Sequence, residues 1–135
     1  MKKNQDIGKL LLRFTVGGLM IFHGIHKLIH GHDFIIQQLE TAGLPKWMWV
    51  GVPIAEVVAP LAIILGIATK LSSLLIAFTM LMSLYLLYGW NLFQFSEVGA
   101  LKIEANVFFL MGAICIMLLG SGKYSVYKGR TSLLK

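Results

Sequence analysis

The chain has 135 residues, of which 57% are hydrophobic and only 13% are charged. Soluble domains carry about 25% charged residues, and one core of this size could not bury so much apolar surface. Intrinsic disorder is excluded as well, because it needs low hydrophobicity and high charge. The composition therefore predicts an all-α, polytopic membrane protein with a single membrane domain over residues 1–135.

Four apolar runs follow one another along the chain, each close to the roughly 20 residues that span a bilayer. The predicted membrane helices cover residues 10–28, 47–67, 71–88 and 101–119. Between the first two, residues 32–46 have an amphipathic pattern, and Asp33 is a candidate helix cap. We therefore expect a four-helix bundle with a short surface helix in its first outer loop.

The distribution of Lys and Arg predicts the orientation of the chain in the membrane. Nine basic residues share one side if both termini are cytoplasmic: Lys2, Lys3, Lys9, Arg13, Lys70, Lys123, Lys128, Arg130 and Lys135. Only Lys27, Lys46 and Lys102 fall on the other side. This favours an N-in and C-in topology. The net charge of +6 is thus concentrated at the chain ends, which leaves no basic surface for a nucleic acid.

Several polar residues lie within or beside the apolar runs, where charged groups are costly and usually face the bundle interior. The candidate pocket residues are Arg13, His23, Lys27, Glu56, Glu104 and Asn106. His23, Glu56 and Glu104 come from three different predicted helices and all fall in the outer half of the membrane. We expect them to line one polar pocket that opens to the outer face.

Glu56 lies between Pro53 and Pro60 in the second apolar run. Pro60 has no N–H, so the carbonyl of Glu56 loses its helical partner. Two interpretations stay open. Glu56 is either a functional carboxylate that exchanges protons in a cavity, or a structural acid paired with His23 or a tyrosine of another helix.

Arg13 and the small residues of the first run have more ordinary interpretations. Arg13 lies one turn inside the cytoplasmic end, and we expect its side chain to snorkel to the inner headgroups. The alternative is a fixed cation that steadies an interior carboxylate or binds an anionic headgroup. Gly17 and Gly24 are spaced to let helices approach closely.

The sequence offers little for metal or redox chemistry. His26 and His30 have a spacing that can chelate a metal, but they are weak candidates and no metal site is expected. All four histidines lie on one helix and its exit, which excludes a haem held by histidines from two helices. Cys115 is the only cysteine, so no disulfide redox pair forms within the chain. No nucleotide-binding motif is present.

The order and spacing of these elements resemble the DoxX family of small four-helix bacterial membrane proteins. The matching pieces are Leu-Leu-Leu-Arg13 with Gly17-Gly18, then His23-Gly24-Ile-His26-Lys27-Leu28, Glu56, Leu65-Gly66-Ile67-Ala68-Thr69-Lys70 and Gly120-Ser-Gly122-Lys123-Tyr124-Ser125-Val126. The family's closing motif usually continues with an Asp, where this chain has Tyr127.

The resemblance implies a bacterial inner-membrane protein that is linked to redox enzymes. Founding members of the family look like a small membrane subunit of a thiosulfate:quinone oxidoreductase, and others are linked to terminal oxidases or oxidative-stress complexes. It therefore implies an accessory subunit whose outer pocket binds a quinone or a small sulfur oxyanion, with Glu56 or His23 handling protons. Whether the chain is itself an enzyme stays open.

Two other functions remain alternatives to the redox-associated one. The first is a non-enzymatic membrane scaffold or partner-binding protein, in which Arg13, His23 and Glu56 only hold the bundle together. The second is a small proton-coupled transporter, which would act as a homodimer because four helices are few for a lone transporter.

Overall fold

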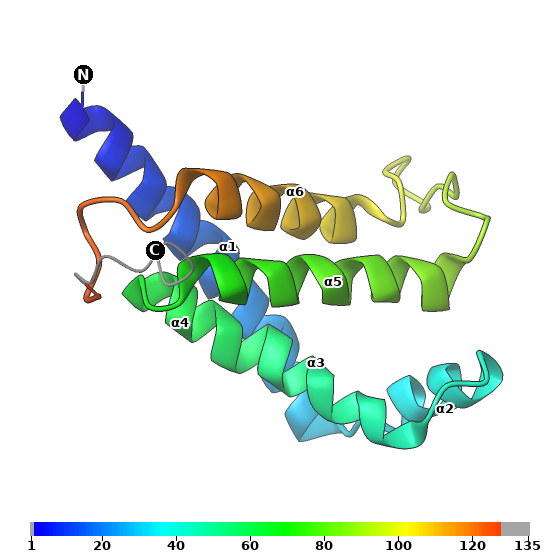
Figure 1. Cartoon of the computed structure of the whole chain (residues 1–135). Helices are drawn as coiled ribbons and strands as arrows, with labels where there is room; N and C mark the ends of the chain where they lie inside the picture. Colours follow the sequence, from blue (N-terminus) through cyan, green and yellow to red (C-terminus); the bar gives the residue numbers. More distant parts are fainter. Residues whose placement is uncertain (1, 128–135) are drawn as a thin grey trace.

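The computed structural model describes residues 2–127, and this part of the chain is helical with one isolated bridge between Phe95 and Leu101. The elements in chain order are α1 (Lys2–His30), α2 (Asp33–Thr41), the 3-10 turn η1 (Lys46–Val50), α3 (Gly51–Pro53), the π turn η2 (Ile54–Val58), α4 (Ala59–Leu65), α5 (Thr69–Tyr88) and α6 (Glu104–Leu119) (Figure 1). The segments from η1 to α4 follow one another without a break and form one long helix, called helix 46–65 below.

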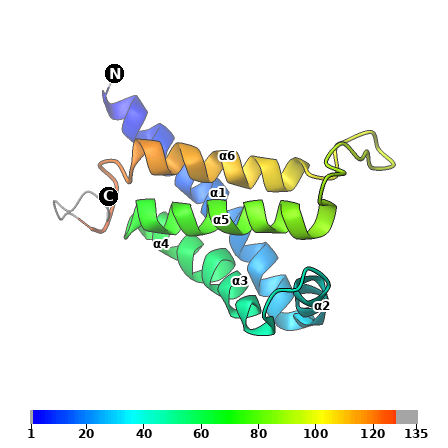
Figure 2. The same cartoon turned by 45° about the vertical axis from the view of Figure 1, so that its right-hand side comes forward.

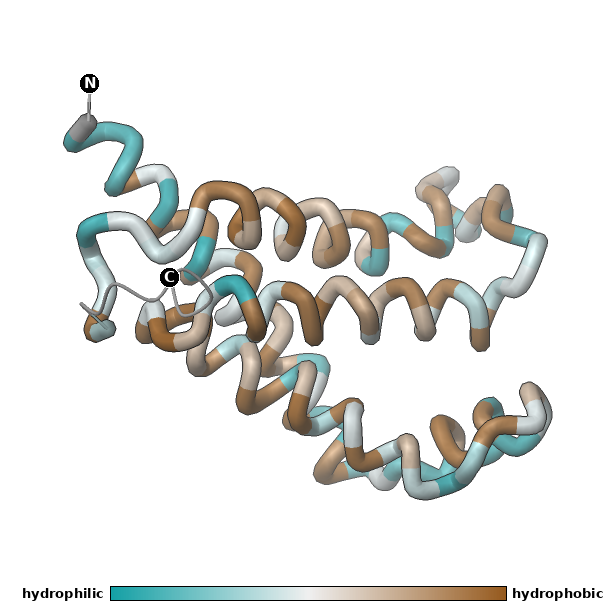
Figure 3. Tube along the Cα trace, in the orientation of Figure 1, coloured by the Kyte–Doolittle hydropathy of each residue, from teal (hydrophilic) through white to brown (hydrophobic). Residues whose placement is uncertain are grey.

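Three helices are long and apolar enough to cross a membrane: Lys3–His30, Lys46–Leu65 and Thr69–Tyr88. They correspond to the first three predicted spans. The fourth predicted span, 101–119, is shorter than expected, because α6 begins at Glu104 and has 16 residues. At 1.5 Å per residue α6 is about 24 Å long, against about 30 Å for a hydrocarbon core. Figure 3 shows apolar residues along most of α5 and α6 and hydrophilic ones at the start of α1.

The long helices alternate in direction and pack as a bundle. α5 and α6 lie side by side and antiparallel, while α1 crosses them obliquely and packs against α4, η2 and α6 (Figures 1 and 2). The core between them is apolar and includes Val16, Met20, Ile63, Ile76 and Ile116. Many large apolar side chains remain on the outer faces of the helices. In water such a surface would be a liability, whereas in lipid it is the expected one.

Arg13 holds together the end of the bundle where α1 begins, and the snorkelling expectation is wrong. Its side chain is 1% exposed. The guanidinium donates to the carbonyls of Ile63 and Ile64 at 2.7 and 2.6 Å, and to those of Ser121 and Tyr124 at 2.6 Å each. It thus satisfies carbonyls at the end of α4 and in residues 120–127, called the closing segment below. The Ile63 carbonyl also accepts the N–H of Gly66 at 3.0 Å, so the guanidinium supplements the backbone bonds at the C-terminus of α4.

The closing segment covers this end of the bundle. Val126 N–H donates to the Leu65 carbonyl at 2.9 Å, and Lys123 N–H donates to Asp6 Oδ1 at 3.2 Å. Gly66 has φ +74°, and a Cβ there would lie 2.4 Å from Ser125 Cβ and 2.7 Å from Arg13 Nη2. The sequence motif that follows the fourth apolar run is therefore explained by its contacts with the ends of α1 and α4.

The predicted surface helix between the first two spans is present as α2. Leu39 faces inward and is buried, while Phe34 stays exposed. Asp33 does not cap the helix as expected: the N-cap position is His32, and no side-chain cap bond is formed. The His32 ring instead stacks on Trp49 at 3.7 Å between centroids, which ties the start of α2 to helix 46–65.

Gly17 and Gly24 are close-approach positions, as the sequence indicated. A Cβ on Gly17 would lie 2.8 Å from Ile64 Cγ1, and one on Gly24 would lie 2.6 Å from the carbonyl oxygen of Glu56. Real Cβ contacts with backbone are never that short. α1 and helix 46–65 can therefore be this close only because glycine stands at both positions.

We expect Gly24→Ala to destabilise the protein by about 1–3 kcal/mol, because the backbone of η2 would have to move. Gly18 is the matched control, since a Cβ there meets nothing within 4 Å. Gly18→Ala should stabilise α1 by about 0.5–1 kcal/mol through its better helix propensity. Thermal denaturation of both variants in detergent would check this, and equal effects would contradict the close contact.

Candidate functional site

Glu56 is a buried carboxylate with one partnered and one unpartnered oxygen. Its side chain is 2% exposed, and Oε1 accepts a hydrogen bond from Lys27 Nζ of α1 at 2.6 Å. Oε2 is also buried, but it has no hydrogen-bond partner among residues 2–127. Leaving a buried oxygen of a charged group without a hydrogen bond costs more free energy than leaving one of a neutral group unpaired. The site therefore has an acceptor position ready for a donor from outside the chain.

The local backbone brings Glu56 to this position through the π turn η2. Ala59 N–H bonds the Ile54 carbonyl, five residues back, in place of the usual four. Pro60 cannot donate, so the sequence already disfavours a regular helix here. Single π turns inside α-helices occur frequently at functional sites. The irregularity that the two prolines predicted is therefore found, as a widened turn with Glu56 at its centre.

A small cavity, called the chamber below, adjoins Glu56 and lies between α1, helix 46–65, α5 and α6. Its volume is about 150 Å³. Its polar lining consists of His23, Lys27, Glu56, Ser83 and Asn106, and its apolar lining of Met20, Met80, Leu87, Ala105 and Phe109. Asn106 Nδ2 donates to Ser83 Oγ at 2.9 Å, which links α6 to α5. The chamber thus combines a carboxylate, an ammonium, an imidazole, an amide and a hydroxyl.

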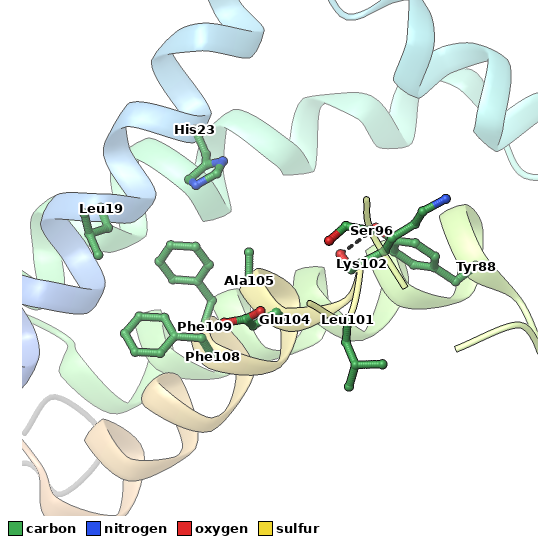
Figure 4. A pocket seen from close by; sticks show the side chains of 10 residues that line it. All are labelled: Leu19, His23, Tyr88, Ser96, Leu101, Lys102, Glu104, Ala105, Phe108 and Phe109. Carbon is green, nitrogen blue, oxygen red and sulfur yellow. Dashed lines mark hydrogen bonds between the residues drawn. The ribbon is translucent and has the colours of Figure 1, made fainter. Parts of the chain in front are cut away.

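A wider cavity, called the vestibule below, lies next to the chamber, between α1, α6 and the loop before α6 (Figure 4). Its volume is about 740 Å³. His23 lines both cavities, and its ring meets Phe109 edge-on at 5.4 Å between centroids. At the other end, Tyr88 Oη donates to the Lys102 carbonyl at 3.0 Å. The vestibule joins the chamber to the end of the bundle that carries the loop of residues 89–103.

The single polar pocket expected from the sequence is thus two adjoining cavities. Glu56, His23, Lys27 and Asn106 line the chamber together. Glu104 shares the vestibule with His23 but is not among the residues that line the chamber, and its side chain is exposed, so the expectation of an inward-facing Glu104 beside Glu56 is wrong. The reason is its position in the first turn of a helix that starts three residues later than predicted.

Arg13 lies outside the site, at the opposite end of the bundle. It precedes Lys27 by 14 residues of one helix, which is about 21 Å. The nitrogens of its guanidinium bind backbone carbonyls, so they contact neither Glu56 nor a lipid headgroup.

Sequence reasoning missed two features of the site. The partner of Glu56 is Lys27, and not His23 or a tyrosine. The available signal was the spacing of His23 and Lys27, one helical turn apart on the same face. Ser83, which is not among the candidate pocket residues, is the hydrogen-bond partner of Asn106.

The weak metal candidates lie away from the chamber. His26 and His30 are exposed, and their rings stack at 4.0 Å between centroids. Within residues 2–127 no three His, Cys, Asp or Glu side chains gather in a way that could hold a metal ion. Cys115 is free and exposed on α6.

Comparison with known proteins places the chain in a family. Residues 8–89, more than half of the chain, match the family model named DoxX. The chain is 31% identical over 127 residues to the "Inner membrane protein YqjF" of Escherichia coli K12, covering 93% of this chain and 94% of that protein. It is also 32% identical over 81 residues to the "Putative oxidoreductase CatD" of Bacillus subtilis 168, and this match spans only 60% of each protein. No solved structure matches the chain.

The matched region contains most of α1 and all of helix 46–65 and α5, and with them Lys27, Glu56 and Ser83 of the chamber. The relative that is matched over nearly its whole length is an inner-membrane protein by name, in agreement with the three long apolar helices found here. The chain is a membrane protein of the DoxX family.

Proposed function

We propose that the chain is an accessory subunit of a membrane oxidoreductase and binds the head group of a quinol in the chamber. The observation that carries this proposal is Glu56 Oε2, a buried carboxylate oxygen without a partner that adjoins a cavity with four other polar side chains. A quinol hydroxyl is a neutral donor that such an oxygen would accept. Asn106, Ser83 and His23 offer further hydrogen bonds to the rest of a flat, oxygen-bearing ring.

The charges in the chamber favour a quinol over a small sulfur oxyanion. Within the part of the chain that the structure describes, Lys27 is the only Lys or Arg that lines the chamber, and its ammonium is already paired with Glu56 Oε1. A bound anion would approach the open carboxylate oxygen of the same group, which is repulsive. A neutral hydroxyl meets no such repulsion.

The chamber's residues would bind and orient the head group and move its protons. Oxidation of the quinol to a quinone releases two protons and two electrons. Glu56 would receive the two hydroxyl protons one after the other, and His23, which faces both chamber and vestibule, would pass each outward. The two electrons would go to a redox centre in a partner subunit of oxidoreductase type. A redox function is supported by the name of the relative CatD and by the quinone-linked members of the family.

We expect Glu56→Gln to leave the protein folded but to weaken quinol binding by at least about tenfold, because a charge-assisted hydrogen bond becomes a neutral one. The measurement is equilibrium binding of dimethoxy-methyl-hydroquinone to the full chain in lipid nanodiscs. Glu97→Gln is the control, since Glu97 is an exposed loop carboxylate outside the chamber. Unchanged binding in a stable Glu56→Gln protein would contradict the proposal and favour a scaffold, in which Glu56 serves only the ion pair with Lys27.

We also propose that the chain is a single membrane domain that crosses the bacterial inner membrane four times, with both termini cytoplasmic. The alternating directions of α1, helix 46–65, α5 and α6 support four crossings, and the excess of Lys and Arg at the end where α1 begins supports the orientation. The chamber then lies in the outer half of the bilayer, and the vestibule opens outward.

Single cysteines introduced in a Cys115→Ser background would test this topology. Lys3→Cys and Lys123→Cys should react only with reagent supplied from the cytoplasmic side, and Ala42→Cys and Gln94→Cys only with reagent supplied from outside. All four positions are exposed in the structure. Reaction of Ala42→Cys from the cytoplasmic side would overturn the orientation.

A further inference from the structure

Two more cavities lie on the side of Glu56 that faces away from the vestibule. The nearer one has a volume of about 120 Å³ and shares Lys27, Glu56, Ser83 and Leu87 with the chamber. The farther one has a volume of about 250 Å³ and shares Ile35, Val52, Thr79, Met82 and Leu86 with the nearer one. Together they are called the lateral groove below. The shared side chains make it a continuation of the chamber.

The lateral groove becomes more apolar with distance from Glu56. Its polar residues all line the nearer cavity: Lys27, Gln38, Glu56, Thr79 and Ser83. Among the described residues that line the farther cavity, only Thr79 has a polar side chain, and the rest are Leu, Ile, Val, Met, Ala, Gly and Phe. A ligand that fits both the chamber and the groove must therefore be polar at one end and apolar along the rest.

The groove runs along the bundle toward its middle and opens on the outer surface of the helices. Its α5 lining extends from Leu87 to Leu75, which is 12 residues or about 18 Å of helix. α2 contributes Ile35 and Leu39 to the lining of the groove. Ile54 and Phe78 line the farther cavity from opposite helices and are both exposed. On the proposed topology this mouth faces lipid, and the groove points from the outer leaflet toward the bilayer centre.

We propose that the lateral groove holds the apolar tail of a membrane quinol whose head group lies at Glu56, and that this ligand enters from the lipid between helix 46–65 and α5. This inference rests on the proposed function and adds the ligand's class and its route. A quinol with a long hydrocarbon tail fits the two-part lining, since its hydroxyl meets the unpartnered Glu56 oxygen while the tail follows the apolar walls. A phospholipid fits less well, because its phosphate would meet the same carboxylate.

The structure offers a way to fill the groove without disturbing the chamber. Gly51 lines only the farther cavity, has ordinary helical angles of φ −63° and ψ −27°, and would accommodate a Cβ with nothing within 4 Å. Gly51→Phe should therefore place a ring in the groove. Thr79→Phe fills the junction of the two cavities and is a second variant. Gly18→Phe is the matched control, because a Cβ on Gly18 is equally unhindered and Gly18 lines none of these cavities.

The experiment compares two probes with the same head group, dimethoxy-methyl-hydroquinone alone and the same hydroquinone with a decyl tail. Both are titrated against the full chain in nanodiscs. The concentration of each probe is expressed per lipid molecule, so that the stronger partitioning of the tailed probe into the bilayer does not count as binding to the protein. We expect Gly51→Phe to weaken binding of the tailed probe by at least about tenfold, as overpacking does, and to leave binding of the tail-less probe unchanged. Gly18→Phe should bind both probes like the wild type.

The outcomes separate the groove from the chamber. Wild-type affinity for the tailed probe in both Gly51→Phe and Thr79→Phe would overturn the lateral groove as the tail site, while loss of tail-less binding in Glu56→Gln would still support the proposed function. Equal loss of both probes in a folded Gly51→Phe protein would also overturn it, since the ring would then act on the head group. Absence of binding of either probe to the wild type would overturn the proposed function and this inference together.

Discussion

Replacement of Arg13 by leucine should prevent the protein from accumulating in the membrane. The change removes the guanidinium that donates to four buried or part-buried carbonyls, of which that of Ile63 keeps a backbone donor, the Gly66 N–H; the loss is about 1–3 kcal/mol for each carbonyl left unsatisfied. Even half of that sum is comparable with the whole stability of a small domain. The amount of folded protein after mild detergent extraction, measured by size-exclusion chromatography, would check this.

Arg13→Lys keeps the result interpretable if the leucine variant cannot be isolated. Lysine retains the charge but has a single nitrogen, which cannot reach carbonyls on two sides as the planar guanidinium does. We expect a folded protein with a lowered thermal midpoint. Lys123→Leu removes a charge from the exposed part of the closing segment and should change stability by less than about 0.5 kcal/mol. Similar effects of Arg13→Lys and Lys123→Leu would refute the role given to Arg13.

Removal of Lys27 should be the most damaging change at the other end of the bundle. In Lys27→Met the Glu56 carboxylate stays buried without its only hydrogen-bond partner. Breaking a buried ion pair in this way lowers the free energy of unfolding by about 3–5 kcal/mol. We expect the lower figure here, because the Lys27 side chain is 39% exposed. The thermal midpoint should fall by about 10 °C.

A double-mutant cycle distinguishes an unpaired charge from lost packing. Glu56→Gln alone should change stability little, and Lys27→Met combined with Glu56→Gln should recover most of the loss, because no uncompensated charge then remains. Additive effects of the two substitutions would show that the ion pair contributes nothing to stability.

The sequence could predict those features whose physical cause is the type of the residue itself or of its neighbours in the chain. The burial of Glu56 was predictable because a carboxylate between Pro53 and Pro60 in an apolar run has few alternatives to the interior. The close approach of α1 and helix 46–65 was predictable from Gly17 and Gly24, since the absence of a side chain is itself the cause. The three long helices and α2 followed from hydrophobic periodicity in the same way.

Features that depend on distant backbone groups could not be predicted. The carbonyls that Arg13 binds lie 50 to 111 residues further along the chain, and a carbonyl carries no residue-specific signal. Lys27 was predicted both as a topology marker and as a pocket candidate, but its pairing with Glu56 was not predicted, because that depends on how α1 packs against helix 46–65. Glu104 was placed in the interior by extrapolating an apolar run that begins three residues before the helix does.

The π turn at residues 54–58 has a consequence for how sequences of this family are aligned. One residue corresponds to about 100° of rotation around a regular helix. If a relative lacks one residue in this turn, the helix before it is rotated by that angle relative to the helix after it. A carboxylate at the aligned position would then face the lipid or α5 instead of α1. A matching Glu in an alignment is therefore equivalent to Glu56 only where the length of this turn is also the same.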